Sequence, residues 1–359
     1  MEISVDISNE DFIYHLPNAI ILVCYIVLGS LGNVSVLIVY MKDMKNVFSS
    51  GRLFIPFLAF VDLITLNYNG WVEFASEVQQ FHESKDKELA CKINKFIGLI
   101  LVITSGCIYF AIAVHRYILI CRPHSKEFTL KVKIAVMVTT VLFIVGVSVP
   151  NYIFSGFTSI SIKSKRFRNE TETVFICGTD EHFENATSSN AYHYILTVNS
   201  LIWSSLMAII YILVGRRIRQ RIKETCPKPH TKDDDTISSA TDSANHGRIP
   251  DHSQRQKPRL VKQITAKSIT TFITNNRLSW MFILMTVLNV VCYVPKLILD
   301  IHFNRDRYFF IGKPMSLCLL LVFFDNFYLF NNVVNPFIYG FFDKEFRNRF
   351  KKRFCTYCK

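Results

Sequence analysis

The stretch CKINKFIGLILVITSGCIYFAIAVHRY, residues 91–117, decides the fold of this chain. In it, 20 residues separate Lys95 from Arg116, and none of them is aspartate, glutamate, lysine or arginine. An α-helix rises about 1.5 Å per residue, so a helix of this length matches the roughly 30 Å hydrocarbon core of a bilayer. The stretch therefore predicts a transmembrane helix with Cys91 near one end and His115-Arg116-Tyr117 near the other.

The rest of the chain has the composition of a membrane protein with several spans. Hydrophobic residues make up 50% of the 359 residues, and they gather in long blocks that charged connections separate. A soluble protein would instead contain short apolar runs broken by charge. Seven blocks are predicted to cross the membrane, at residues 17–41, 53–79, 92–121, 132–156, 191–215, 278–303 and 313–340.

The distribution of positive charge predicts the orientation of these spans. The formal net charge is +13, and 29 of the 41 lysines and arginines fall in residues 41–52, 116–133, 216–277 and the tail after Tyr339. The segment before Pro17 contains none. By the positive-inside rule the amino terminus is extracellular and the carboxyl terminus cytoplasmic. Because the basic clusters border membrane segments, nucleic acid is not an expected partner.

We expect three regions: an extracellular tail at 1–16, a transmembrane domain at 17–340, and a short amphipathic helix and cytoplasmic tail at 341–359. The first span would serve as its own insertion signal, since no basic leader precedes it. Residues at about 224–262 are low in apolar content, which predicts a disordered cytoplasmic loop. After Tyr339, phenylalanines 342, 346 and 350 share one helical face, which is typical of a helix lying in the membrane interface. The expected fold class is an all-α membrane protein, a seven-helix bundle with a short eighth helix.

Four residues are candidates for modification. Asn169 and Asn185 begin Asn-X-Thr glycosylation sequons in the connection at 157–190, which the charge distribution places outside the cell. Cys355 and Cys358 follow the predicted amphipathic helix and are candidate palmitoylation sites. Two unmodified terminal cysteines are the alternative.

Several motifs, in order along the chain, resemble those of the rhodopsin-like (class A) G-protein-coupled receptors. They are Gly32-Asn33, Leu58-Ala59-Phe60-Val61-Asp62, Cys91, Ser105, Arg116, Cys177, Cys292-Tyr293-Val294-Pro295, Asn331 and Asn335-Pro336-Phe337-Ile338-Tyr339. The resemblance covers nearly the whole chain. It implies a plasma-membrane receptor, not an enzyme, that couples an extracellular ligand to a heterotrimeric G protein, with arrestin and a receptor kinase as further partners.

The resemblance also assigns roles to residues. Cys91 and Cys177 would form a disulfide between the third span and the second outer loop, and Arg116 would contact the G protein. Prolines in the sixth and seventh spans would mark kinks about which helices move, or static bends. The residues implied in coupling and activation are His115, Arg116, Tyr117, Tyr211, Pro295, Asn335, Pro336 and Tyr339.

Asp62 is an ionisable residue in mid-membrane, which costs several kcal/mol unless it is paired or hydrated. The resemblance implies an allosteric sodium ion at Asp62. The alternative is a protonated Asp62 in a hydrogen-bond network with Asn33. The residues of this polar core are Asn33, Asp62, Ser105, Asn331 and Asn335.

Two departures from the family pattern concern the resting state. His115 stands where an acidic residue usually precedes the arginine, and Asn275 stands where the sixth span often carries glutamate. In the family, these carboxylates hold the arginine in the resting receptor, and this chain has neither of them. We therefore expect appreciable signalling without agonist.

The expected ligand cavity is lined by Glu73, Gly98, Tyr293, Lys296, Asp300 and Asp325. Gly98 replaces the aspartate of amine receptors, which disfavours a monoamine. Internal pairing of Lys296 with Glu73 or Asp325 is one interpretation, and a charged or amidated ligand is the other. The charged outer loop favours a peptide, either a neuropeptide or a peptide hormone. A chemosensory or small-metabolite receptor is the second hypothesis, and a transporter or channel is a third that the lack of internal repeats disfavours.

Overall fold

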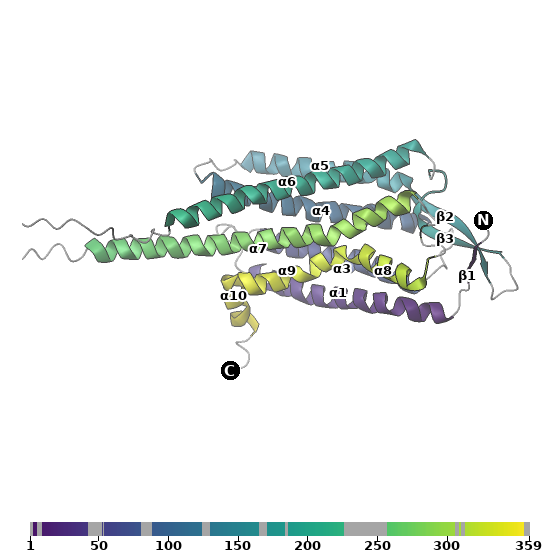
Figure 1. Ribbon diagram of the computed structural model, residues 1–359, viewed down its shortest axis with the longest axis horizontal. Helices are drawn as coiled ribbons and strands as arrows, with labels where there is room; N and C mark the ends of the chain where they lie inside the picture. The colour runs from purple at the N-terminus through teal and green to yellow at the C-terminus, as the bar shows by residue number, and fades with distance from the viewer. Residues whose placement is uncertain are drawn as a thin grey trace, which may run out of the picture.

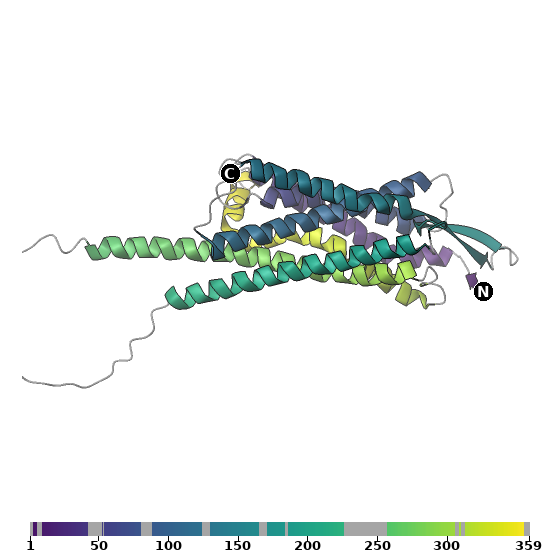
Figure 2. The same cartoon turned by 90° about the horizontal axis from the view of Figure 1, so that it is seen from above.

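The computed structural model describes residues 3–5, 9–41, 52, 54–79, 88–123, 130–164, 171–183, 186–225, 257–305, 309 and 313–354. Within these residues, seven helical segments lie side by side in one elongated bundle (Figures 1 and 2). They are α1 (Asn9–Met41), α3 (Phe54–Gln79), α4 (Glu88–Cys121), α5 (Leu130–Phe154), α6 (Thr187–Thr225), α7 (Lys257–Arg305), and the pair α8 (Met315–Asn326) and α9 (Tyr328–Phe342). The predicted helical bundle is confirmed.

The two ends of the bundle differ. At one end, which we call the sheet end, three strands form a small sheet in the order β1 (Ile3–Val5), β2 (Ser155–Ser164) and β3 (Thr171–Thr179). Strands β2 and β3 form an antiparallel hairpin, and β1 pairs with β2 in parallel. At the other end, which we call the α10 end, the short helix α10 (Lys344–Phe354) turns away from the bundle axis (Figure 1). The predicted eighth helix is therefore present.

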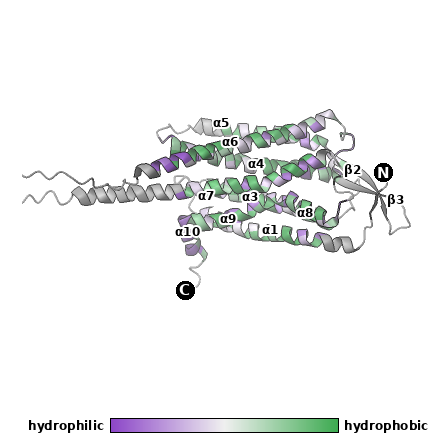
Figure 3. Cartoon of the chain, viewed as in Figure 1, coloured by the Kyte–Doolittle hydropathy of each residue, from purple (hydrophilic) through white to green (hydrophobic). Residues whose placement is uncertain are grey.

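The outer surface of the bundle is apolar along much of its length. Four described segments are each long and apolar enough to cross a membrane: His15–Met41, Glu88–Cys121, Thr187–Arg221 and Arg277–Phe303. The pair α8 and α9 passes the same test as one span bent by 51°. Large side chains such as Leu142 and Ile195 are more than 60% exposed, and Figure 3 shows hydrophobic residues over the mid-length of the helices. Lipid would cover such a surface.

Several helices extend beyond the predicted blocks. Helix α1 begins at Asn9, although the first span was expected to begin at Pro17. Helix α6 reaches Thr225 and α7 begins at Lys257, so both ends of the expected disordered loop at 224–262 are helical. Residues 226–256 lie outside the described residues.

The connection at 157–190 also differs from a simple polar loop, because it contains most of the hairpin. In the seventh span, the main bend lies at Phe327, nine residues before the predicted kink at Pro336. The backbone N–H of Phe327 donates to the carbonyl of Phe324, and that of Phe330 donates to the carbonyl of Phe327. These three-residue spacings tighten the turn between α8 and α9.

Close helix packing centres on α1, α3 and α9. A Cβ added to Gly29 would overlap Leu66 Cδ1, and one added to Gly32 would lie 2.9 Å from Pro336 Cγ. Small residues let helix backbones approach in a membrane, where the hydrophobic effect gives little drive for association. The glycines therefore fix α1 against α3 and α9, which positions the polar residues described below.

Candidate functional site

Asp62 lies in a fully buried polar cluster that joins α3, α4 and α9. Its side chain is 0% exposed. The amide nitrogen of Asn335 donates to Asp62 Oδ2 at 2.7 Å and to the Tyr109 hydroxyl at 2.9 Å. Asn331 Nδ2 donates to the same hydroxyl at 3.1 Å. Asn335 therefore links the Asp62 carboxylate to Tyr109 of α4, and Asn331 bonds the same tyrosine.

Asn33 of α1 is also fully buried, but it does not form the predicted hydrogen bond with Asp62. Its Nδ2 donates to the backbone carbonyls of Gly29, at 3.0 Å, and of Asn332, at 2.9 Å. It therefore ties α1 to α9 through main-chain atoms. The hydrogen-bond partner of Asp62 is Asn335.

Some buried oxygens of these helices accept no hydrogen bond among the described residues. They belong to Asn33, Asp62, Thr65, Ser105 and Asn335. A buried oxygen without a partner costs roughly 1–3 kcal/mol. A carboxylate with hydroxyl and amide oxygens is the donor set that a hard cation or ordered water prefers. The residues of the predicted sodium site therefore fit such an ion.

Arg116 is buried near the α10 end of α4, with 1% exposure. Its guanidinium carbon lies 4.4 Å from the centre of the Phe282 ring on α7, a cation–π contact. The neighbouring His115 ring lies 5.4 Å from the ring of Phe54 on α3. The His115-Arg116 pair is thus packed between α3 and α7.

The two predicted activation tyrosines lie near this region on different helices. Tyr211 of α6 accepts a 3.1 Å hydrogen bond from Thr286 of α7, and it interacts electrostatically with Arg116. Tyr339 of α9 is 0% exposed, and its hydroxyl has no hydrogen-bond partner among the described residues. Tyr117 packs instead against the small α4–α6 cluster of residues 120, 214 and 218.

Charged side chains gather nearer the sheet end, between α7 and α8. Lys296 Nζ donates to Asp325 Oδ1 at 3.1 Å and lies 3.7 Å from Asp300 Oδ1. The ammonium is also 5.2 Å from the centre of the Tyr328 ring. Lys296 and Asp325 each keep 20% of their side-chain exposure, so the pair remains accessible. Of the two internal pairings proposed for Lys296, the structure forms the one with Asp325.

Glu73, Tyr293 and Gly98 complete the predicted ligand set. Tyr293 packs against the core cluster that contains Tyr328. Glu73 is half-buried and makes no hydrogen bond or ion pair with any described residue. Gly98 of α4 faces Asn69 of α3 across the helix interface.

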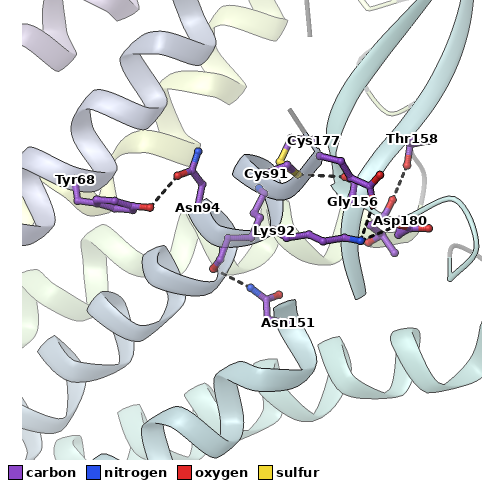
Figure 4. The surroundings of a disulfide bond; sticks show 12 residues. Tyr68, Cys91, Lys92, Asn94, Asn151, Gly156, Thr158, Cys177 and Asp180 are labelled. Carbon is purple, nitrogen blue, oxygen red and sulfur yellow. Dashed lines mark hydrogen bonds and ion pairs between the residues drawn. A yellow bond between two sulfur atoms is a disulfide. The ribbon is translucent and has the colours of Figure 1, made fainter. Parts of the chain in front are cut away.

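Cys91 and Cys177 form a disulfide that joins α4 to β3 (Figure 4). Their Cα atoms are 5.7 Å apart, and Cys177 pairs with Phe157 in the hairpin register. Lys92, next in the chain, lies 3.9 Å from Asp180 just beyond the hairpin. The predicted disulfide is confirmed, and it fixes the hairpin over the sheet end.

Comparison with known proteins agrees with this arrangement. The family model described as "7 transmembrane receptor (rhodopsin family)" matches residues 32–339. The chain belongs to this family. Among solved structures, squid rhodopsin is similar, with a TM-score of 0.65 and 17% identity over 98% of this chain and 87% of that one. A search of curated proteins finds no match.

As a rhodopsin-family receptor, the chain is a multi-pass membrane protein of a G-protein-coupled receptor family, and this family is not enzymatic. A group of three or more histidine, cysteine or acidic side chains that could hold a metal is absent from the described part of the chain. The candidate modification sites Asn169, Asn185, Cys355 and Cys358 lie outside the described residues.

A second network, at the α10 end, was not predicted from the sequence. Asp343 Oδ1 accepts the backbone N–H of Glu345 at 2.9 Å and so caps α10. Its other oxygen accepts bonds from Arg52 Nε at 2.8 Å and from the Tyr40 hydroxyl at 2.9 Å. Arg52 also lies 2.7 Å from Glu345. The network thus ties α1, the segment before α3, and α10 together.

Burial alone would lower the pKa of Arg52, but attraction by Asp343, their hydrogen bond and the Glu345 charge outweigh it and raise this pKa. The guanidinium therefore stays charged. Phe346 of α10, 6% exposed, packs on the rings of Tyr40 and Tyr339. The aspartate at the start of α10, two residues before Glu345, was the local signal for this cap.

The substitution Asp343→Asn tests this network. The amide keeps an oxygen that can cap α10 but loses the charge that faces Arg52. We therefore expect the free energy of unfolding to fall by about 3 kcal/mol. Tyr40→Phe removes one neutral hydrogen bond and should cost about 1 kcal/mol. Hydrogen exchange of the purified receptor, read by mass spectrometry, should show faster exchange of α10 amides in Asp343→Asn than in Tyr40→Phe. Equal α10 protection in both variants and the unsubstituted chain would contradict this role.

Proposed function

We propose that the chain is a plasma-membrane receptor that binds an extracellular peptide at the sheet end and activates a heterotrimeric G protein at the α10 end. The amino terminus is extracellular and the carboxyl terminus cytoplasmic. The observation that carries the proposal is the family match together with Arg116, a buried cation near the cytoplasmic end of the bundle. Arrestin and a receptor kinase are further proposed partners.

At the cytoplasmic end, Arg116 supplies a planar group with five N–H donors, which suits recognition of backbone carbonyls better than lysine does. In the present structure it stacks on Phe282 of α7. Movement of α7 away from α4 would free the guanidinium for an inserted G-protein segment. Tyr211 and Tyr339, on the neighbouring helices α6 and α9, are the proposed contacts of that open state.

The residue before Arg116 is histidine, and Asn275 stands where the sixth span often carries glutamate. The two carboxylates that hold the arginine in the resting state of many family members are therefore replaced by other residues in this chain. Breaking a buried ion pair costs roughly 3–5 kcal/mol, so a resting state without these two pairs lies closer in free energy to the open state. We therefore propose measurable signalling without agonist.

At the extracellular end, the Lys296–Asp325 pair, Asp300 and Glu73 present charge inside the bundle beneath the hairpin. Several charged groups suit a ligand with several polar groups, such as a peptide, better than a lipid. In the sequence, the connection at 157–190 also contains basic residues before Cys177, which add to this argument: Lys163, Lys165, Arg166 and Arg168. A small water-soluble metabolite is the second candidate ligand.

In the polar core, Asp62, Ser105 and Asn335 offer oxygens that lack hydrogen-bond partners among the described residues. We propose that these residues hold a sodium ion, with Asn33 and Asn331 supporting the site from α1 and α9. A bound cation supplies the positive charge that lets Asp62 stay ionised in mid-membrane. Such binding would stabilise the resting receptor.

The first test is a panel of G-protein activation sensors in cells that express the receptor without added ligand. We expect activity above that of empty cells because His115 and Asn275 replace the two carboxylates that usually hold the arginine in the resting state. Arg116→Ala should reduce the signal to the empty-cell level at equal surface expression. Arg217→Ala, which removes an exposed arginine of α6, is the matched control and should keep the signal.

Silence of the unsubstituted receptor at good surface expression would contradict the proposed basal activity. The same panel would then be repeated with a peptide library. No Arg116-dependent response to any peptide would contradict the proposed function.

Sodium binding is tested by the thermal stability of the purified receptor in sodium chloride and in choline chloride at equal ionic strength. A sodium concentration ten times the dissociation constant should stabilise the receptor by about 1.4 kcal/mol. Asp62→Asn should remove the difference between the salts. Asn67→Ala, an exposed polar position on the same helix, should retain it. A sodium effect of equal size in Asp62→Asn would contradict the site.

A further inference from the structure

Glu73 stands out among the charged residues of the proposed ligand site. Lys296 satisfies Asp325 and Asp300, but no described cation lies within ion-pair distance of Glu73. Its electrostatic neighbours are Lys296 and Lys95, which attract the carboxylate, and Asp325 and Glu77, which repel it. Glu73 therefore lies among attracting and repelling charges but has no ion-pair partner among the described residues.

A half-buried carboxylate between membrane helices is costly when nothing neutralises it. Glu77, one turn further along α3, shows the contrasting case. It is 7% exposed, and its carboxylate lies 2.8 Å from His15 Nδ1 of α1. The α3 carboxylate nearer the centre of the bundle is therefore the one left open.

A second observation, independent of charge, points to the same place. Asn69 lies one helical turn before Glu73 on α3, and it is 5% exposed. Its side chain makes no hydrogen bond with any described residue. The Asn69 amide atoms are not among the fully buried atoms that lack a partner, so a polar group from elsewhere can reach them.

The α4 residue that faces Asn69 is a glycine, so no side chain of α4 covers the amide at this position. A Cβ built on Gly98 would meet only the Asn69 side chain, with Oδ1 at 3.3 Å and Cγ at 3.9 Å. One turn away, Tyr68 donates a 2.8 Å hydrogen bond to Asn94 and links α3 to α4. Asn69 therefore packs against the α4 backbone at Gly98.

We propose that Glu73 and Asn69, which lie one turn apart on α3 beside Gly98 of α4, form a subsite for a cationic group of the ligand, an ammonium or guanidinium. The carboxylate of Glu73 would neutralise the cation, and the Asn69 oxygen would accept one of its N–H donors. Lys296 remains the internal partner of Asp325 and Asp300. The inference rests on the proposed function, since it names the ligand chemistry of that receptor site.

The subsite is tested without a ligand by two thiol reagents of similar size and opposite charge. They are the trimethylammonioethyl and sulfonatoethyl methanethiosulfonates, applied to the full-length Gly98→Cys receptor in lipid nanodiscs. Mass spectrometry follows modification of Cys at this position alone, so the native cysteines do not interfere. After correction for their rates with a small free thiol, we expect the cationic reagent to react about tenfold faster.

Glu73→Gln in the same background should bring the corrected rate ratio close to one, and Glu73→Asp should restore most of it. Glu77→Gln is the matched control, because that carboxylate is already occupied by His15, and it should leave the ratio unchanged. Equal rates in the parent, a ratio indifferent to Glu73→Gln, or failure of both reagents to reach the site in the folded receptor would overturn the proposal.

A functional arm uses peptide agonists from the library in pairs that differ only in arginine or its uncharged isostere citrulline. The arginine form should be about tenfold more potent, and Glu73→Gln should abolish this difference. Peptides that activate equally in both forms would overturn the subsite while leaving the receptor function intact. If no peptide activates, the peptide function fails, and the reagent ratio still decides the subsite.

Discussion

A carboxylate in the middle of a membrane must find its partners inside the protein, because hydrocarbon supplies none. In this receptor that carboxylate is Asp62, and a neighbouring helix supplies its hydrogen-bond partner. Asn335 reaches it from α9 and also bonds Tyr109 of α4. The glycines at 29 and 32 allow α1 to pack closely on α3 and α9. The polar core and the close packing are thus two aspects of one arrangement.

The same constraint explains the two ends of the bundle. Near the sheet end, Lys296 joins α7 to α8 through Asp325, just beyond Pro295 in the chain. Near the α10 end, Arg52 and Tyr40 converge on Asp343, while Arg116 is held by the aromatic face of Phe282. Ion pairs therefore link the helices near both ends, and the residue proposed to couple to the G protein packs on a helix that is proposed to move.

Hydropathy and charge predict the helices because span length and orientation are local properties of the sequence. The disulfide and the polar core followed from motifs whose spacing resembles that of the family. The ion pair of Arg52 and Asp343 could not be predicted from the sequence. These residues are 291 positions apart, and neither lies in a distinctive motif. The bend at Phe327 was missed because no proline or glycine marks it. Glu73 lacks an ion-pair partner among the described residues because Lys296 pairs with Asp325. The sequence did not decide whether Lys296 would pair with Glu73 or with Asp325.

The α10 end is proposed to open between α4 and α7 when a G protein binds. Spin labels on unnatural keto amino acids at positions 119 and 280, which are exposed on α4 and α7, would leave the native cysteines unlabelled. The distance between the labels is then measured by pulsed electron paramagnetic resonance, with the receptor alone and with nucleotide-free G protein. We expect the distance distribution to shift to longer values in the complex and Arg116→Ala to prevent this shift. An unchanged distribution with G protein stably bound would contradict the proposed opening.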